Sequence, residues 1–303
     1  MKPSSEMARR DFLRLTLAAS TAVGIGANPA ETNAADSEPL WLRGLRLIDV
    51  NVSLSRWPFR RLPLDETESL LTRLKSRGVT QAWAGSFDGL LSKDLASVNE
   101  RLTAECREPG RGALIPFGSV NPTLPDWQED LRRCAKVHKM RGIRLHPNYH
   151  DYKLTDPRFA DLLEQAASQG MVVQIAASME DERVQHPMLR VANVELAPLL
   201  SLLEKIPGLR VVLLNCFRAV KGDILVQLAR TGRVWFDIAM VEGVGGVGQL
   251  LERVPANRVL FGSHAPFYYF EAAALKLQES LLSKEQLANI SSQNARALLS
   301  RKS

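Results

Sequence analysis

The sequence predicts an α/β protein of the (β/α)8-barrel class, known as the TIM barrel. Eight short apolar runs alternate with eight stretches of helical periodicity after the first 40 residues. Several runs, such as 210–214, are almost wholly apolar, which is typical of a parallel strand buried on both faces. The eight units fill about 265 residues, close to the usual size of such a barrel.

The elements follow in order along the chain. Strands are predicted at residues 45–52, 79–84, 113–120, 142–146, 171–176, 209–214, 234–238 and 258–262. Helices are predicted at 65–77, 93–107, 125–139, 156–169, 194–205, 221–230, 247–254 and 271–282, with a terminal helix at 284–301. Left-handed glycines should end four helices at Gly78, Gly170, Gly208 and Gly232. Helix N-caps are expected at Asp65, Asp156 and Ser292.

A doubly wound open sheet is the alternative fold. It would require a glycine-rich phosphate loop after an early strand. The glycine run at 243–248 follows the seventh strand and lacks the Lys-Ser/Thr of a phosphate loop, so it predicts a flexible loop at one end of the barrel.

Composition excludes several classes of protein. The 303 residues are 45% hydrophobic and 24% charged, which fits a globular chain with a large core. The net charge of +6 is spread along the sequence and indicates no nucleic-acid partner. Cys106, Cys134 and Cys216 form no Cys-x-x-Cys pair, so buried free thiols are expected.

Residues 1–36 are predicted to be a twin-arginine signal peptide, and residues 37–303 the mature barrel domain. Arg9 and Arg10 precede Phe12, Leu13 and a weakly apolar run. The apolar stretch 12–27 is shorter than the roughly 20 residues of a membrane span, so no anchor is expected after cleavage. The twin-arginine export machinery is therefore an expected partner, and the periplasm the expected location.

Polar residues mark the ends of the predicted strands. Asn51 and Ser53 end the first strand, and Arg144 and His146 end the fourth. Asn215, Asp237 and His264 end the sixth, seventh and eighth strands. Because the carboxyl ends of the strands form the active sites of this architecture, we expect a small-molecule pocket there.

The chain resembles the amidohydrolase-related family over about residues 45–300. The resemblance lies in Ile48-Asp49-Val50-Asn51-Val52-Ser53, Gly142-Ile143-Arg144-Leu145-His146-Pro147, Val211-Val212-Leu213-Leu214-Asn215, Arg258-Val259-Leu260-Phe261-Gly262-Ser263-His264-Ala265-Pro266 and Asn294-Ala295-Arg296. It implies a metal-dependent-hydrolase-like TIM barrel, among hydrolases, decarboxylases and lactonases.

The same resemblance implies that the usual metal site is altered or absent. The family usually has a His-x-His pair on the first strand, histidines on strands five and six, and an aspartate on strand eight. The corresponding residues here are Asn51 and Ser53, Ala176, Asn215 and His264. Asn and Ser are poor ligands for Zn²⁺.

Three hypotheses follow. In the first, the protein is a hydrolase in which His264 is the general base, oriented by Asp237 and assisted by His146. Arg144 would anchor a carboxylate or an oxyanion. A covalent version adds Ser53 as the nucleophile of a Ser53, His264, Asp237 triad. The other predicted substrate-binding residues are Asn51, Ser53, Asn215, His150, Glu182 and Arg183.

The second hypothesis is a relocated divalent metal site. It would use His146, His150 and His264, with Asp237 or a carboxylate of the polar loop 179–187. The third is a barrel that binds a ligand or partner without catalysis. His138 is expected on a helix surface.

Aromatic residues follow strands one and eight: Trp57, Phe59, Phe267, Tyr268, Tyr269 and Phe270. They fit either an apolar wall of the pocket or, for Trp57 and Phe59, the subunit contact of a homo-oligomer.

Overall fold

The computed structural model describes residues 44–108, 111–220 and 222–300, and the predicted signal at 1–36 lies outside them. The described residues form eight parallel strands in the order β1 to β8. These are β1 (Leu47–Leu54), β2 (Val79–Ser86), β3 (Leu114–Ser119), β4 (Gly142–Leu145), β5 (Val172–Ala176), β6 (Arg210–Leu214), β7 (Val234–Asp237) and β8 (Val259–Leu260).

The sheet closes between β1 and the residues that follow β8. The backbone N–H of Val50 donates to Phe261 O at 3.0 Å, and that of Ser53 donates to Ala265 O at 2.9 Å. The predicted barrel is confirmed, and the open doubly wound alternative is wrong.

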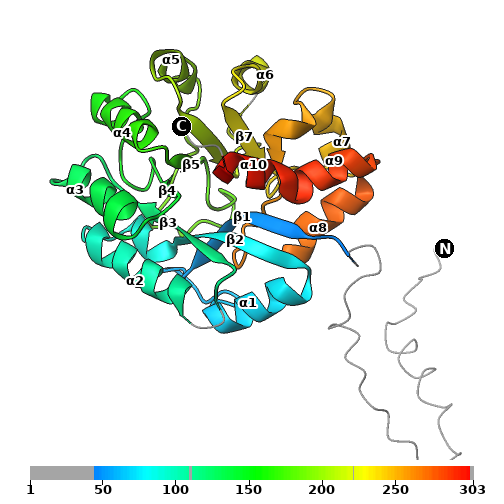
Figure 1. The fold of residues 1–303 in the computed structure, drawn as a ribbon, viewed down its shortest axis with the longest axis horizontal. Helices are drawn as coiled ribbons and strands as arrows, with labels where there is room; N and C mark the ends of the chain where they lie inside the picture. The colour runs from blue at the N-terminus through cyan, green and yellow to red at the C-terminus, as the bar shows by residue number, and fades with distance from the viewer. Residues whose placement is uncertain (1–43, 109–110, 221, 301–303) are drawn as a thin grey trace, which may run out of the picture. The chain divides into compact units, whose positions relative to one another are not determined.

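Helices surround this sheet, as the view in Figure 1 shows. They are α1 (Thr67–Ser76), α2 (Leu95–Arg107), α3 (Trp127–Arg132), α4 (Pro157–Ser168), α5 (Leu199–Lys205), α6 (Asp223–Arg230), α7 (Gly246–Leu251) and α8 (Phe270–Glu279). Their apolar faces pack on the outside of the sheet in one continuous core. A second core fills the barrel interior, where Trp83 stacks on Phe117 with ring centroids 4.9 Å apart.

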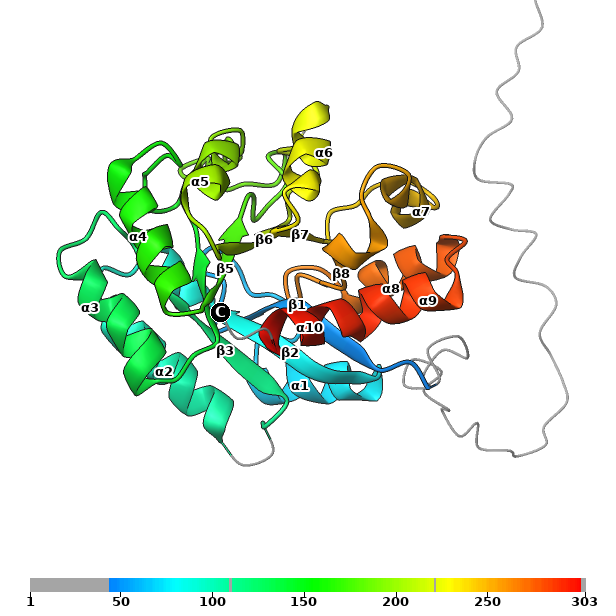
Figure 2. The same ribbon diagram turned by 45° about the horizontal axis from the view of Figure 1, so that its top comes forward.

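The terminal segment covers the amino-terminal end of the barrel. It comprises α9 (Lys284–Ala288), a π-helical turn (Asn289–Gln293) and α10 (Asn294–Ser300). Figure 2 shows α9 and α10 running from beside α8 towards the middle of the barrel. Ala295 and Leu298 of α10 join the interior core, so α10 closes the barrel interior at this end.

Most local expectations agree with the structure. Gly78, Gly170, Gly208 and Gly232 have φ of 80°, 66°, 76° and 70°. Asp156 caps α4 by accepting the N–H of Arg158 at 2.9 Å, and all three cysteines are buried and free. Among the described helices, none combines the length and apolar character needed to cross a membrane.

Three expectations are wrong. Asp65 caps no helix, because Glu66 occupies that position and the Asp65 carboxylate binds Arg61. Ser292 lies inside the continuous helical segment that ends in α10, so it cannot be an N-cap. His138 is buried rather than exposed.

Candidate functional site

An amide–carboxylate network occupies the carboxyl end of the barrel, here called the mouth. The Nδ2 atom of Asn51 donates to Asn215 Oδ1 at 2.9 Å and to Asp237 Oδ2 at 2.7 Å. The backbone N–H of Asn215 donates to Asp237 Oδ1 at 2.8 Å. Burial raises the pKa of Asp237 to about 7, and the donors from Asn215 and Asn51 oppose that rise. Asp237 is therefore a carboxyl group that gains and loses its proton near neutral pH.

Asp49 joins the first strand to the last. Its carboxylate accepts the hydroxyl of Ser263 at 2.5 Å and the N–H groups of Ser263 and Asn51 at 3.0 Å. Gly262 lies beside this seam, where an added Cβ would come within 2.8 Å of Asp237. The sequence therefore needs glycine at this position to let Asp237 approach Asn51.

The guanidinium of Arg144 bonds to the barrel wall, whereas the sequence predicts that it binds a carboxylate or an oxyanion. Its Nε donates to Gln174 Oε1 at 2.8 Å, and its Nη1 donates to Val52 O and Ser53 Oγ at 2.8 and 3.2 Å. Its Nη2 donates to Val50 O and Trp83 O at 3.4 and 3.0 Å. All five donors of the guanidinium thus have acceptors within the barrel wall, which leaves none for an incoming carboxylate.

His264 has a hydrogen-bonding pattern that suits a base. Its Nε2 lies 2.9 Å from the carbonyl oxygen of Met179, and because a carbonyl only accepts, Nε2 carries the proton. Nδ1 then keeps its lone pair, and it has no partner in the described structure. Burial lowers the pKa of His264 to about 4, so the ring is neutral at pH 7.

The predicted pairing of Asp237 with His264 is absent. The Asp237 oxygens accept hydrogen bonds from Asn51 and Asn215. The Nε2 atom of His264 bonds to the Met179 carbonyl, and its Nδ1 atom has no partner among the described residues. Ser53 Oγ accepts from Arg144 rather than approaching an imidazole. The structure therefore does not assemble the Ser53, His264, Asp237 triad.

Two more imidazoles lie at this end. His146 and His150 follow β4, with ring centroids 6.0 Å apart. His150 Nε2 donates to Gly89 O at 2.8 Å, and Nδ1 of both rings is buried without a partner in the described chain. Burial lowers the pKa of both, and the nearby charges of His150, Arg144 and His264 lower that of His146 further.

Aromatic side chains cover the mouth. Trp57 contacts Phe59, Phe87 and Phe267 edge to face, at centroid distances of 5.5, 5.3 and 5.0 Å. Phe267 also stacks on His264 at 4.9 Å. Trp57 is 2% exposed, so it belongs to this wall and is not available for a subunit contact.

The loop between β5 and α5, residues 177–198, places its charges differently from expectation. Glu182 and Arg183 are exposed, and Arg183 pairs with Asp181 at 2.6 Å instead of facing the mouth. The side chain that turns inward is Glu180, which is 4% exposed and accepts from Arg60 Nη1 at 2.5 Å. Arg60 was missed as a site residue, since an arginine in a polar loop carries no signal of its partner.

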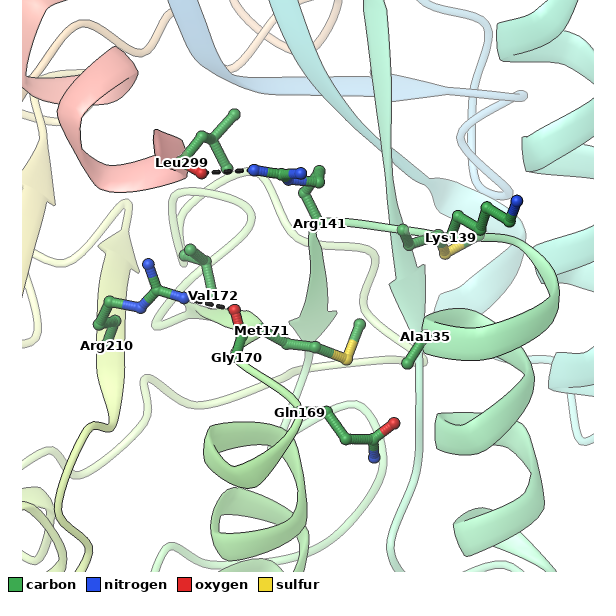
Figure 3. A pocket seen from close by; sticks show the side chains of 10 residues that line it. Ala135, Lys139, Arg141, Gln169, Gly170, Met171, Val172, Arg210 and Leu299 are labelled. Carbon is green, nitrogen blue, oxygen red and sulfur yellow. Dashed lines mark hydrogen bonds between the residues drawn. The ribbon is translucent and has the colours of Figure 1, made fainter. Parts of the chain in front are cut away.

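A polar cavity of about 310 Å³ lies at the opposite end of the barrel. Figure 3 shows Arg141 bonded to Leu299 O of α10 and Arg210 bonded to Gly170 O. Arg210 also donates to Leu298 O at 2.8 Å, so both arginines help to hold the C-terminal turn of α10 against the barrel. Because catalysis in this architecture takes place at the carboxyl ends of the strands, this cavity is not the candidate site.

The residues at the mouth do not fit the family's divalent metal. Asn51 directs its amide N–H groups at Asn215 and Asp237, and the Arg144 cation lies against Ser53. No group of three or more His, Cys, Asp or Glu in the described part of the chain could hold a metal ion. The relocated site formed by His146, His150 and His264 is therefore not assembled.

Fold and site together define a TIM barrel with a polar mouth built on strand ends. The sequence profile of the amidohydrolase family matches residues 60–301, and the chain belongs to that family. Comparison with curated protein sequences gave no match.

Solved structures share the fold at low identity. The 2,6-dihydroxybenzoate decarboxylase from Rhizobium is 12% identical, with a TM-score of 0.66, covering 84% of this chain and 98% of its own. The 5-carboxyvanillate decarboxylase from Sphingomonas paucimobilis is 12% identical, with a TM-score of 0.68 and coverages of 84% and 99%. The 5-carboxyvanillate decarboxylase from Novosphingobium aromaticivorans was solved as a mutant with bound manganese. It is 15% identical, with a TM-score of 0.67, and the match covers 87% of this chain and 99% of its own.

Proposed function

We propose that this protein is a hydrolase of the amidohydrolase family that acts on a small molecule through side-chain acid–base chemistry at the mouth. The observation that carries the proposal is the buried, neutral His264, whose Nδ1 lone pair has no partner in the described structure. An unpaired buried nitrogen is costly and needs an explanation, and a role in proton transfer would supply one.

In the proposed reaction His264 accepts one proton and Asp237 donates another. Water attacks the acyl carbon of an ester, lactone or amide, and its proton passes to His264 Nδ1. The leaving oxygen or nitrogen takes the proton of the Asp237 carboxyl, whose pKa of about 7 keeps part of it protonated at neutral pH. The products are an acid and an alcohol or amine, and solvent returns both side chains to their starting states.

Turnover of a panel of esters, lactones and amides tests this function, with carbon dioxide release from aromatic acids measured beside it. His264→Gln should abolish hydrolysis, while His138→Gln, a buried histidine at the other end of the barrel, should leave it unchanged. The pH profile should fall below about 4 and above about 7, the pKa values of the base and the acid. Full activity in His264→Gln would refute the mechanism.

Ligand binding without turnover is the second candidate. It is favoured by the self-satisfied network of Asn51, Asn215 and Asp237, which is the pattern of a structural cluster. Saturable binding of a small molecule, with no product from any member of the panel, would select it.

The proposed site of action is the periplasm, reached through the twin-arginine machinery. Arg9-Arg10 and the following apolar run support this proposal. Replacing both arginines with lysine should retain the protein in the cytoplasmic fraction, and unchanged export would refute the route.

A further inference from the structure

Lys276 places its ammonium group at the end of the strand that carries the proposed acid. It belongs to α8, whose apolar face packs on the outside of the sheet, and its side chain is half-buried. The Nζ atom donates to Ile238 O at 3.2 Å and also donates to Ala239 O. These carbonyl groups belong to the two residues that follow Asp237 in the chain. A lysine from the outer layer of helices is therefore bonded to the backbone next to Asp237.

The end of β7 needs this support because its sheet pairing stops at Asp237. The ladder between β7 and β8 ends with the pair of Asp237 and Leu260. Ile238 and Ala239, which follow, are buried. Buried carbonyl groups need a donor within the protein, and the Lys276 ammonium provides one beyond the end of the ladder. Lys276 thus fixes the backbone at the point where the sheet no longer does.

The charge of Lys276 also acts on the Asp237 carboxyl group. Asp237 is fully buried, and the donors on its oxygens are the neutral amide groups of Asn51 and Asn215. Burial raises the pKa of Asp237 to about 7, the nearby charge of Lys276 lowers this pKa, and that of Asp49 raises it. The ammonium therefore favours the ionised form of a carboxyl group that burial keeps partly protonated.

The other charged or titratable groups that act on Lys276 and Asp237 come from the surrounding elements. They are Asp49 of β1, Arg144 of β4, Cys216 after β6, Glu242 after β7 and Glu279 of α8. Burial lowers the pKa of the Lys276 ammonium, and the carboxylates near it, Asp237 first, oppose that change. The cations that act on Asp237 are thus Arg144, which bonds to the barrel wall, and Lys276, which bonds to the strand of Asp237 itself.

We propose that Lys276 is a positioning residue for Asp237, which holds the end of β7 and offsets the negative charge that Asp237 acquires when it protonates the leaving group. In the proposed reaction the O–H bond of Asp237 breaks, its proton forms the new bond on the leaving oxygen or nitrogen, and a carboxylate remains inside the barrel. A buried carboxylate carries a large desolvation cost, which a fixed cation nearby reduces. The proposal rests on the proposed function only in making Asp237 the acid.

NMR spectroscopy of the aspartate carboxyl carbons in isotope-labelled protein tests this role without any substrate. The Asp237 signal is identified by its absence in Asp237→Asn, and its titration should have a midpoint near pH 7. Lys276→Gln keeps an amide donor for the carbonyl groups but removes the charge, so it should raise the midpoint by about one pH unit. Lys276→Met should raise the midpoint at least as far, and Lys276→Arg should restore it. Lys284→Gln, which changes an exposed lysine of α9, is the control and should leave the midpoint unchanged.

A lysine with a merely structural role would not produce this pattern. An unchanged midpoint in Lys276→Gln, or equal changes in Lys276→Gln and Lys276→Arg, would overturn the proposal. If Lys276→Met does not fold, Lys276→Gln decides, because its amide can still donate to Ala239 O. In a protein that turns over the panel, the alkaline limb of the pH profile should move with the NMR midpoint. A raised midpoint in a protein without turnover would refute the proposed hydrolase and leave the effect of Lys276 on Asp237 intact.

Discussion

Replacing Arg144 with methionine tests whether its guanidinium holds the barrel wall or serves a ligand. Five acceptors on β1, β2 and β5 lose a charged donor in this variant. Removing the guanidinium leaves several buried neutral acceptors without a donor, and each unsatisfied group costs about 1–3 kcal/mol, so we expect a loss of about 3–5 kcal/mol. At about 2–4 °C per kcal/mol for a domain of this size, we expect Tm to fall by roughly 6–20 °C.

Urea denaturation followed by tryptophan fluorescence measures this loss in the free energy of unfolding. Arg144→Lys keeps the charge without the fork and should lose about half as much stability. Arg132→Met, which removes an exposed arginine paired with Glu129, is the matched control and should lose less than about 1 kcal/mol. An Arg144→Met protein as stable as this control, but without turnover of the ester, lactone and amide panel, would refute the reasoning and restore the anchoring role.

Four further predictions concern the titration of two buried groups, the packing of one glycine, and metal binding. The pKa of His264 is about 4 in the folded protein and 6.5 in the unfolded chain, so between these pH values only the unfolded chain binds the proton. The free energy of unfolding therefore falls by about 3 kcal/mol as the pH is lowered from 6.5 to 4. His264→Gln should flatten this slope in urea titrations. Asp237 acts with the opposite sign: its folded pKa of about 7 makes stability fall as the pH rises from about 4 to 7, and Asp237→Asn should remove that fall. Gly262→Ala should cost about 1–3 kcal/mol in the same assay through the 2.8 Å clash with Asp237, whereas Gly112→Ala, in open space, should cost less than about 0.5 kcal/mol. Excess Zn²⁺ or Mn²⁺ should leave Tm within about 1 °C of the untreated protein, and a rise of several degrees would contradict the donor geometry.

The barrel was predictable because its signal is repeated. Each of the eight units carries the same alternation of a buried run with an amphipathic helix, so an error in one boundary does not change the fold. The eighth strand was predicted over 258–262 and pairs with β7 over Val259–Leu260 alone. The register of neighbouring strands decides such ends, and no local pattern contains that register.

The contents of the mouth were predictable, but the hydrogen-bond pairing within it was not. Strand ends placed Asn51, Asn215 and Asp237 together, because parallel strands present their carboxyl ends on one side. The acceptors of Arg144 are largely backbone carbonyls, which every residue has, so composition cannot identify them. In the 177–198 loop, the backbone path turned Glu180 inward and Glu182 outward, a choice that two identical side chains cannot signal.

The 177–198 loop contacts the proposed base, His264, directly. Met179 and Glu180 are adjacent, and the Met179 carbonyl fixes the proton of His264 on Nε2 while the Glu180 carboxylate holds Arg60. Burial, the cause of the low pKa of His264, also depends on this loop and on Phe267 remaining in place. The pKa of His264 is therefore sensitive to the position of this loop.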